Sequence, residues 1–171
     1  SKAGVEQWRV ETLDAVVDID QAENGTIYIA GTSTGGGSWF AAYEASGTKI
    51  RHTILGGVVA RLVRATEDGG CLLAAERADG IELLRFDASG SSLWDSRFEG
   101  EHPHTARDAL VLDSTVAIIG AGEINKQELN WMLLVVDQRG DEVVRHAYGA
   151  EDAGVAIEAS SSGHAVMLGT D

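Results

Sequence analysis

The chain has 171 residues, of which 44% are hydrophobic, 21 are glycine and one is proline, and its net charge is −14. A chain of this size and composition can bury a core as one domain. Its acidic surface repels phosphate backbones and anionic lipids, and no apolar run reaches the roughly 18 residues of a membrane span, so we expect neither nucleic-acid binding nor membrane insertion.

Short strands between glycine-rich turns are predicted along the whole chain, and we letter them a to d from the inner edge of each unit outward. Residues 5–12 predict a lone strand d, and the alternating residues 14–21 predict strand a of a first unit. The dipeptide Asn24-Gly25 is a hairpin signal. Strands b, c and d of this unit are predicted at 26–31, 38–43 and 49–55.

The same order recurs downstream. The second unit is predicted at 59–66, 71–76, 81–87 and 93–98, and the third at 106–112, 116–120, 131–137 and 142–148. The fourth unit has only strands a and b, at 154–159 and 164–169. The predicted order is therefore d-abcd-abcd-abcd-ab, with essentially no α-helix.

The repeat spacing predicts the fold class. Gly47, Gly90 and Gly140 each precede a strand d, and they are 43 and 50 residues apart. A period in this range, filled with short strands, is typical of β-propeller blades. We therefore predict an all-β single repeat domain of about four blades of four antiparallel strands, at 13–57, 58–100, 101–150 and 151–171 plus 5–12.

The turn motifs resemble those of the bacterial seven-bladed β-propeller repeat family. The matching segments are Gly25 to Ser33, Ser46-Gly47 through Gly56-Gly57, Asp68-Gly69-Gly70, and Asp87 to Gly90; the third unit departs, with Asp113-Ser114 for the glycine turn and Ala150 for the final glycine. The resemblance implies a structural repeat without catalytic residues. It also implies a bacterial protein that is extracellular, periplasmic or on the cell surface.

The fourth blade lacks a strand c, so we expect that this polypeptide does not close a ring alone. An unpaired sheet edge tends to recruit another strand. Two explanations stay open: a homodimer that closes one ring from two copies, or a larger propeller of which these blades are one part.

Candidate site residues lie in two long loops that we expect on the same rim, where the d-to-a and b-to-c connections meet. Loop 99–106 is followed by Asp108, and loop 121–130 is rich in polar residues. The candidate ligand-binding residues are Glu101, His102, His104, Asp108, Glu123, Lys126 and Glu128.

Each candidate feature has a structural alternative. His102 and His104 could ligate a divalent cation with nearby carboxylates, or the loop could be an ordinary solvated segment stiffened by proline. Asp18 and Asp20 could bind a cation in the channel, or they could cap the sheet or be solvated. The four tryptophans, Trp8, Trp39, Trp94 and Trp131, are expected to pack between blades, with a sugar-stacking platform as the alternative.

From these patterns we expect a non-catalytic interaction or structural domain that binds a protein or glycan partner through the rim formed by 99–106 and 121–130. No cofactor is predicted. The alternative is a metal-dependent lyase or hydrolase acting at the channel mouth. No motif of a serine hydrolase, zinc protease or paired-cysteine metal site is present in the sequence.

Overall fold

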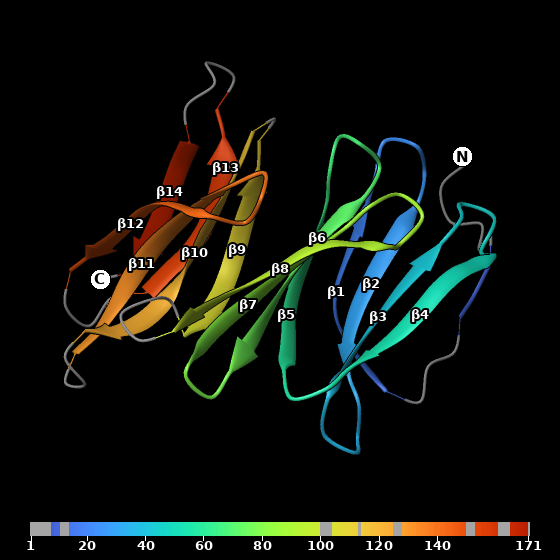
Figure 1. Ribbon diagram of the computed structural model, residues 1–171, viewed down its shortest axis with the longest axis horizontal. Helices are drawn as coiled ribbons and strands as arrows, with labels where there is room; N and C mark the ends of the chain where they lie inside the picture. Colours follow the sequence, from blue (N-terminus) through green and yellow to red (C-terminus); the bar gives the residue numbers. More distant parts are fainter. Residues whose placement is uncertain are drawn as a thin grey trace.

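A computed structural model describes residues 8–10, 14–99, 104–112, 114–124, 128–149, 153–160 and 165–170. Figure 1 shows consecutive antiparallel sheets side by side along the long axis of the molecule. The described residues form 14 strands and no helix. The all-β fold class predicted from the sequence is therefore confirmed.

The first two sheets each have four strands in chain order. Sheet 1 consists of β1 (Ala15–Gln21), β2 (Ile27–Thr32), β3 (Ser38–Tyr43) and β4 (Lys49–Leu55). Sheet 2 consists of β5 (Val59–Ala65), β6 (Cys71–Arg77), β7 (Gly80–Phe86) and β8 (Ser92–Glu99). These bounds differ from the sequence prediction by no more than one residue at either end.

The third sheet is complete and the fourth has two strands. Sheet 3 consists of β9 (Thr105–Val111), β10 (Thr115–Ile124), β11 (Glu128–Asp137) and β12 (Glu142–Tyr148). Sheet 4 pairs β13 (Ala153–Ala159) with β14 (Ala165–Thr170). The described part of the predicted lone strand 5–12, residues 8–10, is not in a strand.

Loop 121–130 is the main correction to the predicted elements. Residues 121–124 continue β10 and residues 128–130 begin β11, with Ala121 opposite Trp131 and Ile124 opposite Glu128. The polar composition of this segment suggested a loop. A hairpin that projects past its neighbours needs no apolar face, however, because its backbone groups pair across the ladder.

The sheets pack face to face. One core joins sheets 1 and 2 and a second joins sheets 2 and 3; they contain Tyr28, Phe40 and Phe86 in the first, and Leu72, Leu83, Ile118 and Leu134 in the second. Along one edge β1 lies beside β5, β5 beside β9, and β9 beside β13. The row of sheets is not closed, and sheets 1 and 4 lie at its two ends (Figure 1).

The tryptophans differ from the prediction. Only Trp39 is fully buried, at 3% exposure, whereas Trp8, Trp94 and Trp131 are half-buried. Trp8 and Trp94 nevertheless contact the next sheet in the same way: each indole Nε1 donates to a turn carbonyl, that of Ala45 at 2.9 Å and of Gln138 at 2.7 Å. Residue 8 thus contacts sheet 1 as a strand-d residue of a preceding sheet would.

Candidate functional site

A polar row along the adjacent strands β1, β5 and β9 joins three sheets. The Arg64 guanidinium donates to Asp18 Oδ2 at 2.6 Å and to Asp108 Oδ1 at 2.5 Å. Each of the three side chains is about three-quarters or more buried. Arg64 belongs to sheet 2 and its two carboxylate partners to sheets 1 and 3, so one guanidinium links the three sheets.

The carboxylates of this row also bind backbone groups of the following sheet. Asp18 Oδ2 accepts from Val63 N at 3.0 Å, and Asp108 Oδ2 accepts from Ile157 N at 3.0 Å. Asp20 Oδ2 accepts from Ala65 N at 2.8 Å. In each bond the acceptor and donor residues are 45, 49 and 45 positions apart in the sequence, which matches the spacing of the sequence repeat.

Electrostatics favour the charged form of this row. Burial alone would lower the pKa of Arg64, but hydrogen bonds and charge from Asp108 and Asp18 outweigh it and raise the pKa above its ordinary value. Because Asp18 and Asp20 cap backbone N–H groups of β5, their contacts match the sheet-capping alternative of the sequence analysis. The polar row therefore connects neighbouring sheets by hydrogen bonds and ion pairs.

The predicted site residues fall in three places. Asp108 lies in the polar row, away from the rim. The backbone N–H of His104 donates to the Ala121 carbonyl at 2.8 Å, and Thr105 is opposite Ala121 in the ladder. The end of loop 99–106 and the base of the β10–β11 hairpin therefore meet at Ala121.

The other candidate residues lie in or beyond this hairpin. Glu123 and Glu128 belong to its paired backbone, and Glu101, His102 and Lys126 lie outside the described residues.

The rim that carries these segments is uneven. Between sheets 1 and 2 a shallow groove of about 380 Å³ is lined by both connection types, at 36–37, 57–59 and 76–78. At sheet 3 the ten-residue strands β10 and β11 project beyond the strands of sheets 1 and 2, which have six to eight residues. The shallow groove and the projecting β10–β11 hairpin therefore lie on the same rim.

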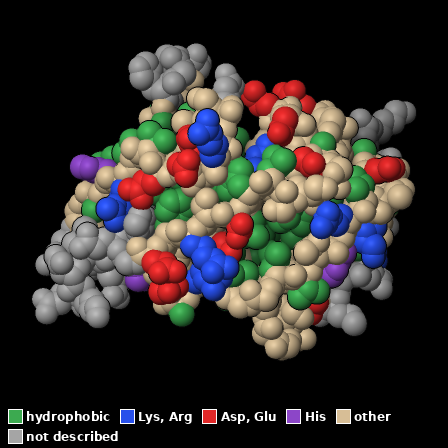
Figure 2. Space-filling model, viewed as in Figure 1, with side chains coloured by type: hydrophobic (Ala, Val, Ile, Leu, Met, Phe, Trp, Pro, Cys, Tyr) green, Lys and Arg blue, Asp and Glu red, His purple; other side chains and the backbone are tan. Residues whose placement is uncertain are grey.

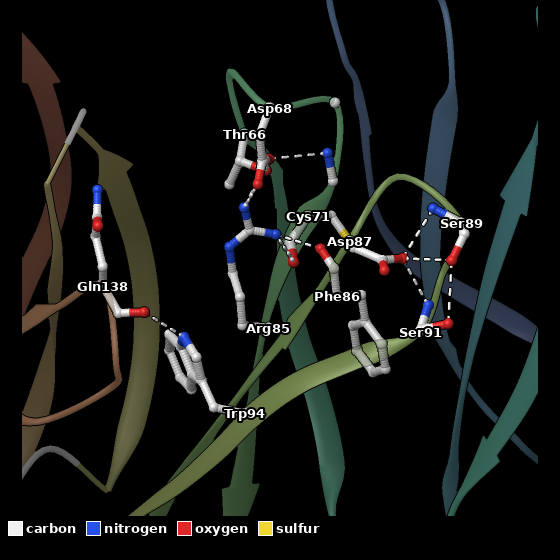
Figure 3. Close-up of polar contacts among 12 residues, drawn as sticks. Thr66, Asp68, Cys71, Arg85, Phe86, Asp87, Ser89, Ser91, Trp94 and Gln138 are labelled. Carbon is white, nitrogen blue, oxygen red and sulfur yellow. Dashed lines mark hydrogen bonds and ion pairs between the residues drawn. The ribbon is translucent and has the colours of Figure 1, made fainter.

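The opposite rim carries the a–b and c–d turns and has a cleft of similar volume, about 390 Å³, between sheets 2 and 3. Acidic side chains gather along the upper rim of the view in Figure 2. One wall of the cleft is Trp94, whose indole reaches across to Gln138 (Figure 3). The opposite wall comes from the strands of sheet 3, with Val111, Leu112 and Val116.

Arg85 lies between Asp68 and the base of the cleft (Figure 3). Its Nη2 donates to both carboxylate oxygens of Asp68, at 2.7 and 2.6 Å, and its Nη1 donates to the carbonyls of Cys71 and Phe86. Burial raises the pKa of Asp68, but hydrogen bonds from Thr66, Arg85 and the Gly70 N–H outweigh it and hold the pKa at about 2. Asp68 is therefore ionised at neutral pH.

Sheet 2 differs from sheet 1 in the row of side chains that lies next to the cleft. By the ladder register, the row Tyr28–Ala42–Arg51 in sheet 1 corresponds to Leu72–Arg85–Trp94 in sheet 2. The hydroxyl of Tyr28 crosses to sheet 2 and donates to the Gly69 carbonyl at 2.5 Å. Leu72 cannot reach so far.

The facing turn is shorter as well. Residues 66–70 form the a–b turn of sheet 2, where Thr66 N donates to the Gly70 carbonyl, whereas in sheet 3 Leu112 N donates to the Thr115 carbonyl. The turn in sheet 3 is one residue shorter. The replacement of glycine by Asp113-Ser114, visible in the sequence, was therefore a signal for a local difference in packing.

Within the described ranges, no group of three or more His, Cys, Asp and Glu side chains is placed to hold a metal ion. The same residues include no helix long and apolar enough to cross a membrane. Arg64 and the cleft were not found by sequence reasoning. The only sequence signals for them were two arginines, Arg61 and Arg64, in an otherwise apolar strand pattern and the departure from the repeat at 113–114.

Comparisons with known proteins give a fold and no family. No protein-family model matches the sequence, and no characterised protein matches it either. Among solved structures, a protein of unknown function from Bacteroides caccae superimposes with a TM-score of 0.63 at 13% identity, over 94% of this chain and 55% of that one. A eukaryotic initiation factor superimposes with a TM-score of 0.58 at 8% identity, over 80% of this chain and 33% of that one. The chain thus spans about half the length of the first structure and a third of the second.

Proposed function

We propose that the chain forms consecutive blades of a β-propeller and acts as a non-catalytic interaction domain, with a protein or glycan as its partner. Four observations support the blade arrangement: each complete sheet has four strands in chain order, strand a of each sheet lies beside the next, the polar row fastens these strands, and Trp8 and Trp94 contact the following sheet alike. The ring needs further blades, from a second copy or from more chain.

The observation that carries the interaction role is the meeting of the two candidate segments at Ala121. The sequence predicted 99–106 and 121–130 on one rim, and in the structure the backbone N–H of His104 donates to the Ala121 carbonyl. A projecting hairpin beside a second loop on a rigid sheet is the usual setting for a recognition surface. The charged side chains of the polar row, in contrast, are already used in hydrogen bonds between the sheets.

Arrayed glycans and arrayed peptides, probed with the purified chain, test this proposal. We expect a ligand that binds without added metal and is recovered chemically unchanged by mass spectrometry. A variant in which residues 123–129 are replaced by Asn-Gly, so that the partners Gly122 and Asn130 flank the turn, should lose that binding and keep its β-sheet circular dichroism. The control Glu44→Ala, on the opposite rim, should bind as the parent does.

Two results would overturn the proposal. One is a ligand that is cleaved or eliminated by the chain. The other is a hairpin variant that binds every ligand of the parent with unchanged affinity. For the blade arrangement, small-angle scattering should show an open arc for one copy or a disc with a central hole for two; a closed ring of one copy of 18.0 kDa would contradict it.

A further inference from the structure

The cleft between sheets 2 and 3 is bounded by two complete four-stranded sheets, so no additional strand of either sheet would cover it. Between sheets 1 and 2 the Tyr28 hydroxyl crosses to the next sheet on this rim and donates to the Gly69 carbonyl at 2.5 Å. Sheet 2 has Leu72 in place of this tyrosine, and the cleft between sheets 2 and 3 is open to solvent. A ligand can therefore enter it.

The cleft has an apolar wall and an aromatic wall. Val111, Leu112 and Val116 of sheet 3 form the first. Trp94 forms the second, and its indole is held in place by the bond from Nε1 to the Gln138 carbonyl, 2.7 Å long. An alkyl chain or a flat group would lie well between these walls. A half-buried indole also attracts a cation over its ring.

The charges in the lining select the sign of the ligand. Glu67 and Asp68 come from the a–b turn of sheet 2, and Asp137 comes from the c–d turn of sheet 3. Backbone hydrogen bonds from Asp141 and Arg139 lower the pKa of Asp137, so this group is ionised at neutral pH. The one cation in the lining, Arg85, already donates to Asp68 and to two carbonyls. Asp68 and Arg85 pair with each other, and the lining as a whole has three carboxylates and one guanidinium, a net charge of −2 that favours a cationic ligand.

We propose that this cleft binds a lysine or arginine side chain of a partner protein. The aliphatic stem lies between Trp94 and Leu112, and the charged head lies between Glu67 and Asp137. The site is on the rim opposite the β10–β11 hairpin, so it goes beyond the interaction surface proposed above and can be tested separately. A basic partner also suits a chain with a net charge of −14.

The probes are three capped tripeptides, acetyl-Gly-Xaa-Gly-amide, with lysine, arginine or norleucine in the middle. Binding is followed by the indole N–H signal of Trp94 in ¹⁵N-labelled protein, assigned with Trp94→Phe. We expect saturable shifts with the lysine or the arginine peptide. The norleucine peptide, which has the stem without the charge, should bind at least about tenfold more weakly, the factor that 1.4 kcal/mol gives.

The chain offers a matched pair of charge variants. Glu67→Gln with Asp137→Asn removes two charges from the cleft and should weaken binding of the basic peptides about tenfold. Glu23→Gln with Asp87→Asn removes the same two charges at the equivalent turn positions of the interface between sheets 1 and 2. If affinity depends on the charges in the cleft and not on the overall charge of the protein, this control should bind the basic peptides within about twofold of the parent.

A second variant covers the case in which the double substitution fails to fold. Gln138→Lys places an ammonium group at the exposed edge of the cleft and should abolish the shifts, whereas Ala88→Lys, at the equivalent exposed turn position of sheet 2, should not. Equal binding of the norleucine peptide, equal losses in both charge-variant pairs, or a Trp94 shift caused by neutral monosaccharides and by neither basic peptide would overturn the proposal. None of these results depends on the β10–β11 hairpin.

Discussion

Asp18 Oδ2 accepts a hydrogen bond from the backbone N–H of Val63, which lies 45 residues further along the chain, at 3.0 Å. The same relationship links Asp108 to Ile157 across 49 residues. In sheet 2 the corresponding residue is Leu62, which cannot accept a hydrogen bond, and the N–H of Ala109 is bound instead by Asp108 Oδ1 at 2.8 Å. Asp108 therefore accepts hydrogen bonds at the interfaces on both sides of sheet 3.

Replacing Asp108 should therefore destabilise the fold. Asp108→Ala leaves the Ile157 N–H without its acceptor and Arg64 with one carboxylate in place of two, and we expect a loss of about 2–4 kcal/mol in the free energy of unfolding. Urea denaturation followed by circular dichroism measures this. The exposed strand residue Asp95, replaced by alanine, should change stability by less than about 0.5 kcal/mol. Equal effects of both substitutions would show that the polar row contributes nothing.

Alanine substitutions at Gly140 and Gly36 distinguish the stability cost of backbone strain from that of steric contact. Both glycines have a left-handed φ, of +82° and +78°, but a Cβ at Gly140 would lie 2.4 Å from Ser96 Oγ and 2.7 Å from the Trp94 ring, whereas one at Gly36 would meet nothing within 4 Å. Gly36→Ala should cost about 1 kcal/mol from the backbone alone.

Gly140→Ala should cost at least about 1 kcal/mol more than Gly36→Ala, because both the Ser96 hydroxyl and the Trp94 indole must move. Thermal unfolding of the two variants gives the difference. In the triple variant Trp94→Ala, Ser96→Ala and Gly140→Ala the extra cost should largely disappear. Its persistence there would show that these two side chains do not set it.

Tyr28 should make stability fall at alkaline pH. Burial raises its pKa from 10.0 to about 12. Above pH 10 the unfolded chain releases this proton while the folded chain retains it, so the contribution is complete below about pH 10 and is lost as pH rises towards 12. The slope of unfolding free energy against pH in this window should shrink in Tyr28→Phe. An unchanged slope would place the titration on another group.

Asp68 should act at the opposite end of the pH scale. Its folded pKa of about 2 is below the ordinary 3.8, so its contribution is present above pH 4 and is lost as pH falls towards 2. The carboxylate is more than half exposed, so the contribution is small because solvent screens it. Asp68→Asn should flatten the acid limb of the stability profile between pH 4 and 2, while Asp95→Asn leaves it as in the parent.

Local chemistry made the strands and turns predictable. Alternating apolar residues and left-handed glycines act within a few residues, so Gly47, Gly90 and Gly140 located the c–d turns, and all three have φ near +80°. The same reasoning placed thirteen of the fourteen strand starts within one residue, the exception being β11. It missed the length of the β10–β11 hairpin because polar residues pair as readily as apolar ones where a ladder leaves the sheet.

The sequence by itself determined that this is a repeat of short antiparallel strands joined by glycine-containing turns. Only the tertiary structure decided what each polar side chain does. Asp108 was a candidate ligand in the sequence and fastens sheets in the structure, because its register on β9 aims it at Arg64 and at the next strand. Likewise the Leu72 that replaces Tyr28 in the repeat is one apolar residue in a strand pattern. The cleft is lined by side chains and turns of both sheet 2 and sheet 3, so no single strand pattern predicts it.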